Sequence, residues 1–264
     1  MSVFKANILD GQVALVTGGG SGIGETIAAT LAAHGAHVGI CGRKQDRLDQ
    51  AIERIAQTNN HQGGSLFGIA ADVRDPDAIQ KAVDATIERF GRLSILINSA
   101  AGNFLAPAAT LSPNGFGTVV DIDLKGTFNA CKAVFPHFRD QNGGNIVNIS
   151  ATLQYLGTQM QIHASSAKAG VDALTRTLAV EWGPANIRVN AVAPGPIDDT
   201  AGMAKLAPKG MKDKLTAKIP LKRFGKRQEI ADTVLFLVSP ASSYTSGAIF
   251  VVDGAQWLAM NTYV

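Results

Sequence analysis

The sequence predicts an α/β fold in which a doubly wound parallel sheet of about seven strands carries helices on both faces. Three observations support this prediction. Short apolar runs, typical of buried parallel strands, alternate with longer helical patterns along the whole chain. A glycine-rich turn, residues 17–24, joins the first apolar run to the first helical pattern. No linker rich in proline, serine and glycine interrupts the 264 residues, so we expect one domain over residues 1–264.

The expected elements follow this alternation from the first strand to the last. Apolar runs predict strands at residues 13–16, 37–41, 65–70, 93–97, 145–149, 187–192 and 249–252. Helical patterns lie between them, at residues 25–33, 45–57, 76–90, 113–140, 162–182 and 230–237. A basic stretch before the last helix, residues 198–226, is predicted to form a helical lid.

The glycine-rich turn has the residue types that a dinucleotide site needs. Its spacing is T-G-x-x-x-G-x-G, with Ile23 where the commoner G-x-G-x-x-G pattern has its last glycine. Glycine permits a sharp turn and a close backbone approach to a pyrophosphate, and the following helix offers free N–H groups to the anion. We therefore predict cofactor contacts from Gly18, Ser21, Gly22, Ile23 and Gly24. The alternative is a glycine-rich loop without a ligand.

The residues after the second strand indicate which dinucleotide is bound. An Asp or Glu usually meets a free ribose 2′-hydroxyl at this point, but this chain has Gly42, Arg43 and Lys44. A guanidinium suits a 2′-phosphate because it can make charge-assisted bidentate bonds. We therefore predict NADP(H) rather than NAD(H), bound by Arg43 and Lys44. The alternative is that both residues simply begin the exposed helix at 45–57.

Two further strand ends supply candidate cofactor contacts. Asp72 can accept from an adenine amino group while Val73 packs on the ring, although Asp72 can equally cap the next helix. Small residues after the fourth strand let a ribose lie close to the backbone, which makes Asn98, Ala100 and Gly102 candidates. We also expect Asn98 to tie its strand to the neighbouring one.

The formal charge of +3 is too small to suggest nucleic-acid binding, but its distribution is uneven. Nine basic residues and one acidic residue lie between Lys205 and Arg227, so the rest of the chain is net acidic. A basic cluster on an otherwise acidic protein suggests one particular anionic partner. The alternative is a solvated helical face.

Cysteine usage and terminal segments suggest no metal site and no membrane partner. Cys41 and Cys131 are far apart, without metal-type spacing, and are expected to be reduced core residues. The first residues lack the apolar region of a signal peptide, and no apolar run is long enough to span a bilayer. The last residues are not the peroxisomal Ser-Lys-Leu signal, so we expect a cytoplasmic protein.

Several motifs in order resemble the short-chain dehydrogenase/reductase family over nearly the whole chain. The matching segments are residues 17–24, 72–73, 98–102, Lys168, 194–197 and 252–254. The resemblance implies a single Rossmann-type domain, usually assembled as a homotetramer. It also implies that Lys168 binds the nicotinamide ribose and that Pro194, Gly195 and Ile197 belong to the cofactor site.

The usual catalyst of that family is only partly present. Lys168 matches, but the Tyr position holds Ala164, the Ser position holds Ala151, and the helix Asn is replaced by Asp123. An alcohol–ketone reaction needs an acid beside the carbonyl that accepts hydride, and a methyl group cannot act as one. An ordinary carbonyl reduction is therefore not expected at this site.

The departures resemble the 2,4-dienoyl-CoA reductases, and most of all their peroxisomal type, which also lacks the tyrosine. Residues 103–105, 121–129, 150–153, 163–171 and 181–184 carry this resemblance. It implies NADPH-dependent reduction of 2,4-dienoyl-CoA to 3-enoyl-CoA during the breakdown of unsaturated fatty acids. An acyl-CoA is then the expected substrate.

The chemistry of a diene suits a site without a phenol. Hydride would attack the far end of the diene, and negative charge would spread to the thioester oxygen as an extended enolate, which needs electrostatic stabilisation. We hypothesise that Lys168 adds positive charge and that Asp123, paired with Lys168 directly or through water, positions the water that protonates the α-carbon. The CoA phosphates would meet the basic lid residues Lys205, Lys209, Lys212, Lys214, Lys218, Lys222 and Arg223.

Three alternatives remain open at this point. The chain could be another carbonyl reductase in which Tyr155 or His163 replaces the missing tyrosine as the acid. It could also be a non-catalytic NADP(H)-binding protein, because so much of the usual catalyst is absent. Asp123 itself could be a buried helix carboxylate that local hydrogen bonds satisfy.

Overall fold

The computed structural model describes residues 4–59, 63–199 and 212–259, and its centre is a parallel sheet. The strands are β1 (Val13–Thr17), β2 (His37–Gly42), β3 (Leu66–Ala70), β4 (Ile95–Asn98), β5 (Gly144–Ile149), β6 (Ile187–Pro194) and β7 (Ile249–Val252). They pair in the order β3-β2-β1-β4-β5-β6-β7, and every pairing is parallel. The predicted doubly wound sheet of seven strands is confirmed.

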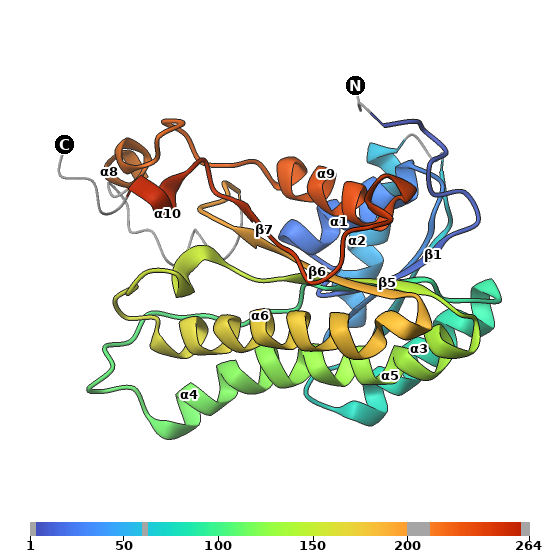
Figure 1. Ribbon diagram of the computed structural model, residues 1–264, viewed down its shortest axis with the longest axis horizontal. Coiled ribbons are helices and arrows are strands. Elements are labelled where there is room, and N and C mark those ends of the chain that lie inside the picture. The colour runs from blue at the N-terminus through green and yellow to red at the C-terminus, as the bar shows by residue number, and fades with distance from the viewer. Residues whose placement is uncertain (1–3, 60–62, 200–211, 260–264) are drawn as a thin grey trace.

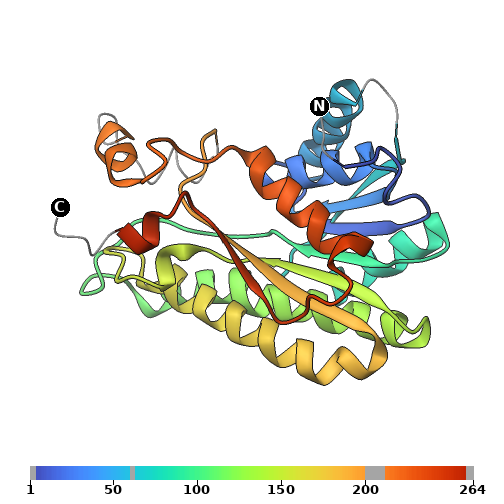
Figure 2. The same cartoon turned by 45° about the horizontal axis from the view of Figure 1, so that its top comes forward.

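Helices cover both faces of this sheet, as Figure 1 shows. The first face carries α1 (Gly22–Ala33), α2 (Gln45–Thr58) and α9 (Arg227–Val238). The other face carries α3 (Pro76–Phe90), α4 (Pro113–Val120), α5 (Gly126–Asp140) and α6 (Ile162–Trp182). Two short helices, α8 (Lys212–Lys218) and α10 (Gln256–Ala259), lie beyond the carboxyl end of β7 in both Figure 1 and Figure 2.

The strands are apolar throughout because both of their faces are buried. Successive side chains of a strand point to opposite faces. Ala14 and Val16 of β1 therefore join the core under α1, α2 and α9, whereas Val13 and Leu15 join the core under α3 and α5. Each helix layer buries its own apolar side chains against one face, so the sheet separates two cores.

The chain changes direction at β1, and this reversal positions a site. From β1 the chain builds β2 and β3 on one side, and α3 then returns it to β4 on the other side of β1. In open α/β sheets, ligands bind outside the carboxyl ends of the strands at such a switch point. Thr17, the last residue of β1, lies at this point. Its Oγ1 accepts hydrogen bonds from the backbone N–H groups of Ser99 (3.1 Å) and Ala100 (3.2 Å).

The helix predicted at residues 113–140 is interrupted in the structure. Between α4 and α5, residues Asp121–Lys125 form a π-helical turn, so one continuous helix is a correction to the sequence prediction. Such turns insert an extra residue into a helix and are frequent at functional sites. Apolar periodicity along the sequence does not reveal them. Here the turn contains Asp123.

Helix α3 corrects a second expectation, that Asp72 could cap it. The residue before its first turn is Asp75, whose side chain accepts from the backbone N–H groups of Asp77 (3.0 Å) and Ala78 (3.2 Å). A carboxylate in this position satisfies donors that the helix leaves open. Asp72 therefore has no capping role, and its carboxylate is instead bound by Arg74.

Part of the predicted lid at 198–226 is helical, in α8, and its two ends meet. Ile197 pairs with Gly225, and the backbone N–H of Asp198 donates to the Gly225 carbonyl at 2.8 Å. Lys205 and Lys209 lie outside the described residues. No helix in the described ranges is long and apolar enough to cross a membrane.

Candidate active site

The sequence-predicted site residues gather at one edge of the sheet. Strands β1, β2, β3, β4 and β6 each end at or just before a group of these residues. Because the strands are parallel, their carboxyl ends lie at the same edge of the sheet. The predicted cofactor residues at this edge are Gly18, Ser21, Gly22, Ile23, Gly24, Arg43, Lys44, Asp72, Val73, Asn98, Ala100, Gly102, Pro194, Gly195 and Ile197. The structure thus brings together segments that are far apart in the sequence.

The turn after β1, residues 17–24, forms a tightly packed glycine cradle at the start of α1. Gly18 has φ +68°, and a β-carbon built on it would lie 2.8 Å from the Ala100 nitrogen. A β-carbon on Gly24 would lie 2.5 Å from the Gly18 carbonyl oxygen. Ser21 precedes α1 without capping it through its side chain, so the first N–H groups of α1 remain available to an anion. These residues fit a dinucleotide pyrophosphate.

Positive charge lies beside the second and third strand ends. Arg43 and Lys44 are exposed between β2 and α2. Arg74 holds Asp72 through a bidentate contact, with Nη2–Oδ2 at 2.6 Å and Nε–Oδ1 at 3.0 Å. These hydrogen bonds from Arg74 hold the pKa of the Asp72 carboxyl below its usual value, and the charge of Arg43 lowers it further. Asp72 is therefore an ionised acceptor at this edge.

Asn98 ties β4 to its neighbour, as the sequence predicts. Its Nδ2 donates to Asn148 Oδ1 on β5 at 2.9 Å, and Asn148 Nδ2 in turn donates to Thr175 Oγ1 on α6 at 2.9 Å. All three side chains are buried. The amide of Asn98 thus aligns the ends of β4 and β5 with α6, which carries Lys168.

Asp123 and Lys168 form a direct ion pair at the centre of the site. Lys168 Nζ lies 3.2 Å from Asp123 Oδ2 and donates to the Ile149 carbonyl, at the end of β5, at 2.8 Å. Asp123 Oδ1 accepts from the backbone N–H of Gly102 at 2.7 Å. The pair therefore joins α6, the π-helical turn, the loop after β4 and the last residue of β5.

This pair is almost entirely withdrawn from solvent, with Asp123 2% exposed and Lys168 7% exposed. A buried charge is tolerated only when it is paired and hydrogen-bonded. The partners of Asp123 come from β4's loop and α6, not from its own helix, so the hypothesis of a locally satisfied helix carboxylate is not supported. The arrangement concentrates an amine and a carboxylate beside the carboxyl ends of β4 and β5.

His163 is buried beside this centre. Its exposure is 0%, and neither ring nitrogen has a hydrogen-bond partner among the described residues. Its ring lies 4.5 Å from the ring of Phe104, measured between centroids. A proton donor needs a path to the reacting atom, and Phe104 covers this imidazole. The geometry does not favour His163 as a substitute acid.

Tyr155 is engaged away from the ion pair, by a residue that the sequence analysis missed. Its hydroxyl donates to Asp172 Oδ2 at 3.0 Å, and Ser150 and Gln154 also donate to the Asp172 carboxylate. Burial and the negative charge of Asp172 raise the pKa of Tyr155 to about 12. Asp172 lies one helical turn after Lys168 on the apolar face of α6, and this buried position was the available signal.

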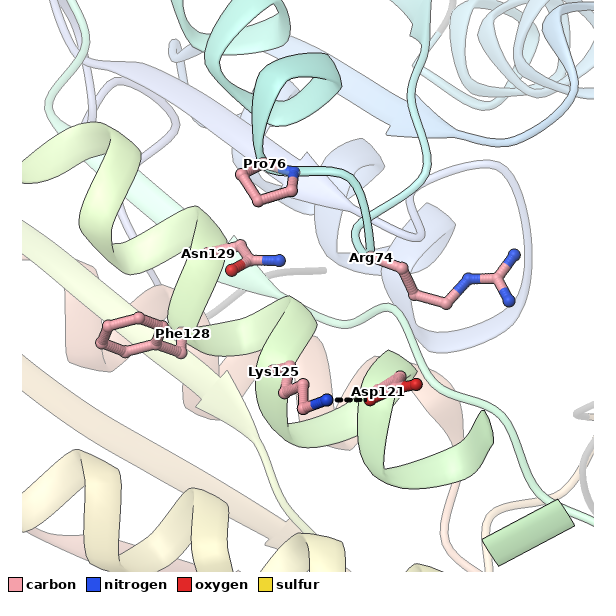
Figure 3. Close-up of a pocket in the computed structure, with 6 residues that line it drawn as sticks. All are labelled: Arg74, Pro76, Asp121, Lys125, Phe128 and Asn129. Carbon is pink, nitrogen blue, oxygen red and sulfur yellow. Dashed lines mark ion pairs between the residues drawn. The ribbon is translucent and has the colours of Figure 1, made fainter. Parts of the chain in front are cut away.

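A hollow lies on the outer side of the π-helical turn (Figure 3). It is lined by Arg74, Pro76, Asp121, Lys125, Phe128 and Asn129. Lys125 Nζ and Asp121 Oδ1 are 2.6 Å apart across one turn, an ion pair marked by the dashed line. None of the sequence-predicted site residues lines this hollow, so it is separate from the Asp123–Lys168 pair.

Two basic residues in the described part of the lid are already paired with carboxylates. Lys212 pairs with Asp198 at 2.8 Å, and Arg223 pairs with Glu229 of α9 at 2.6 Å. Among the described residues, no group of three or more His, Cys, Asp or Glu side chains could hold a metal ion.

Comparison with known proteins agrees with this geometry. A family model described as enoyl-(acyl carrier protein) reductase matches residues 18–255. A zebrafish protein named peroxisomal 2,4-dienoyl-CoA reductase, (3E)-enoyl-CoA-producing, is 50% identical over 97% of this chain and 85% of its own length. A Bacillus subtilis protein named probable 2,4-dienoyl-CoA reductase, (2E)-enoyl-CoA-producing, is 41% identical over 95% of this chain and 98% of its own.

A solved structure of a short-chain dehydrogenase from Bacillus anthracis is 42% identical and superposes with a TM-score of 0.86, covering 93% of this chain and 96% of the other. The parallel sheet and its helices therefore share their fold with a solved short-chain dehydrogenase. The chain belongs to the short-chain dehydrogenase/reductase family.

Proposed function

We propose that this enzyme reduces 2,4-dienoyl-CoA to 3-enoyl-CoA with NADPH, in the breakdown of unsaturated fatty acids. The observation that carries the proposal is the buried Asp123–Lys168 pair, which lies where the family's catalyst would be while Ala151 and Ala164 leave that catalyst without its hydroxyl groups. The names of the zebrafish and Bacillus subtilis relatives support the same substrate class.

Family membership and the glycine cradle imply a nicotinamide dinucleotide, and we propose NADPH in particular. Arg43 and Lys44 are placed to bind a 2′-phosphate, and no carboxylate stands at the end of β2, where a free ribose hydroxyl would need one. Asp72 would accept from the adenine amino group, and Lys168 would hold the nicotinamide ribose. When bound, NADPH supplies the hydride that adds to the far end of the diene.

Lys168 and Asp123 would then handle the charge and the proton. The ammonium of Lys168 lies in a water-poor site, where its charge stabilises an extended enolate more than it would in water. Asp123 would hold the water that delivers a proton to the α-carbon, and protonation there gives the 3-enoyl product. Protonation at the γ-carbon would instead give a 2-enoyl product.

The basic lid would bind the CoA phosphates within a single catalytic domain. Lys212 and Arg223 already pair with carboxylates. Lys214 and Lys218 are exposed on α8 and are therefore the described lysines best placed for phosphates. The joined ends at Ile197 and Gly225 would anchor this lid to the sheet edge.

Assembly and location are also proposals. A homotetramer is supported by exposed apolar side chains on α5 and α6, where Phe128 is 44% exposed and Val180 is 79% exposed. We keep the cytoplasm as the proposed location, although the zebrafish relative is named peroxisomal and the Bacillus subtilis relative is not. Size-exclusion chromatography with light scattering tests the homotetramer, and cell fractionation tests the cytoplasmic location.

NADPH oxidation with 2,4-hexadienoyl-CoA and 2,4-decadienoyl-CoA, assayed side by side, tests the activity. We expect the dienoyl absorbance to fall with at least one of the two substrates. Mass spectrometry with NMR should place the product double bond at C3. Simple ketones serve as the control substrates. Turnover of ketones alone would support another carbonyl reductase, and tight NADPH binding without any acyl-CoA turnover would support a non-catalytic binding protein.

A further inference from the structure

The π-helical turn that carries Asp123 packs directly on α6 through Leu124 and Gly170. A β-carbon built on Gly170 would lie 2.6 Å from Leu124 Cδ2 and 3.0 Å from Leu124 Cδ1. Both distances are shorter than the usual contact between carbon atoms. Leu124 therefore occupies the space into which any other residue at position 170 would place its side chain.

The contact between Leu124 and Gly170 lies next to the Asp123–Lys168 ion pair, in the π-helical turn and in α6. Leu124 follows Asp123 in the turn, and Gly170 lies two residues after Lys168 in α6. The turn is also fastened to its surroundings, because Thr127 Oγ1 donates to the Asp123 carbonyl at 2.7 Å and Gly102 N–H donates to the carboxylate. A change in the gap between the turn and α6 is therefore felt at Asp123.

The backbone conformation at position 170 does not require glycine. It lies inside α6 and does not have the positive φ that favours glycine. In a helix interior glycine is less favourable than alanine because it loses more backbone freedom on folding. A glycine kept there points to close packing, and the three nearest atoms of a built β-carbon from outside its own helix all belong to Leu124.

We propose that Gly170 is a positioning residue that sets the distance between Asp123 and Lys168. Without a β-carbon at position 170, the turn approaches α6 closely enough for Asp123 Oδ2 to lie 3.2 Å from Lys168 Nζ. A methyl group there displaces the Leu124 side chain, and the turn moves away from α6 with it unless the leucine rotates aside. The expected effect on kcat rests on the proposed function, whereas the expected effect on the Asp123–Lys168 distance does not.

Kinetics of Gly170→Ala are the first test. A displacement of about 1 Å at a catalytic group lowers kcat by as much as a hundredfold, so we expect a ten- to hundredfold loss with the Kd for NADPH unchanged. Shortening the opposing side chain in Gly170→Ala/Leu124→Ala makes room for the methyl group and should restore kcat. Gly117→Ala is the control, because this helical glycine of α4 has no described atom within 4 Å of a built β-carbon.

Crystal structures of Gly170→Ala and of the double variant are the second test, and they read the geometry without any substrate. The Asp123–Lys168 distance should exceed 3.2 Å in Gly170→Ala and return to it in the double variant. A wild-type protein that turns over no dienoyl-CoA ends the proposed function but leaves this measurement decisive. An unchanged distance in Gly170→Ala, or a loss of kcat that Leu124→Ala does not restore, overturns the positioning role.

Discussion

Lys168 Nζ lies 3.2 Å from Asp123 Oδ2, and the two side chains reach one another from different helices through an almost dry interior. The carboxylate is held from the other side by the Gly102 N–H, and the amine by the Ile149 carbonyl. Neither charged group can turn away without leaving a buried polar partner unpaired. The pair is therefore a fixed electrostatic feature of the sheet edge, present before any substrate arrives.

Asp123→Ala tests whether this carboxylate takes part in the reaction. We expect dienoyl-CoA reduction to be abolished, because no group is left to hold the water that protonates the α-carbon, while the Kd for NADPH stays unchanged. Steady-state kinetics and a fluorescence titration with NADPH measure the two quantities. Asp121→Ala is the matched control, since Asp121 belongs to the same turn but pairs with Lys125 near the surface. Equal rates for wild type and Asp123→Ala would rule out the assigned role.

Arg43→Ala tests the choice of dinucleotide. A hydrogen bond to a charged group contributes roughly 1.5–3 kcal/mol, so we expect the KM for NADPH to rise by about ten- to hundredfold. The KM for NADH should stay the same, because NADH has no 2′-phosphate. Arg92→Ala provides the control, since Arg92 is exposed before β4, at the opposite edge of the sheet. A parallel rise in both KM values would show that Arg43 acts on the fold and not on the phosphate.

Much of the sheet and of the cofactor edge could be predicted because its signals are local. The apolar run of β1, the glycine turn and the start of α1 follow one another within a short segment, and glycine has a distinct physical role there. Lys168 and Asp123 could be named from a family resemblance, but their direct contact depends on the π-helical turn, which no periodicity reports.

Other parts of the site could not be predicted, because they depend on which buried faces meet. Asp172 accepts hydrogen bonds from three side chains of the loop after β5, and Gly170 matters only because Leu124 faces it. A buried carboxylate in an apolar pattern shows that a partner must exist, but it does not say which one. Such pairings are fixed by tertiary packing between elements that are distant in the sequence.

Tyr155→Phe tests the hydroxyl that Asp172 holds, through the pH dependence of stability. The unfolded phenol loses its proton near pH 10.0, whereas the folded one keeps it until about pH 12. Stability that the hydroxyl contributes is therefore complete below pH 10.0 and is lost as the pH rises through this window.

Urea midpoints across this pH range should fall more steeply for the wild type than for Tyr155→Phe, because all other titrating groups are common to both proteins. The variant should also keep its kcat for dienoyl-CoA, since the phenol donates to Asp172 and not to a substrate. A loss of kcat by a factor of about 100 or more is typical of a missing general acid, and it would mean that Tyr155, not a water held by Asp123, supplies the proton.

His163→Leu tests the buried imidazole under Phe104. Leaving a buried polar group without a hydrogen bond costs about 1–3 kcal/mol, so removing both ring nitrogens should raise the free energy of unfolding by about 1 kcal/mol. Chemical denaturation measures this change, and kcat for dienoyl-CoA should be unaffected. His163→Ala is the comparison, because it removes the same nitrogens but leaves a cavity beside Phe104 and should lower stability. A His163→Leu protein that is less stable than wild type would mean that a bound water satisfies the imidazole.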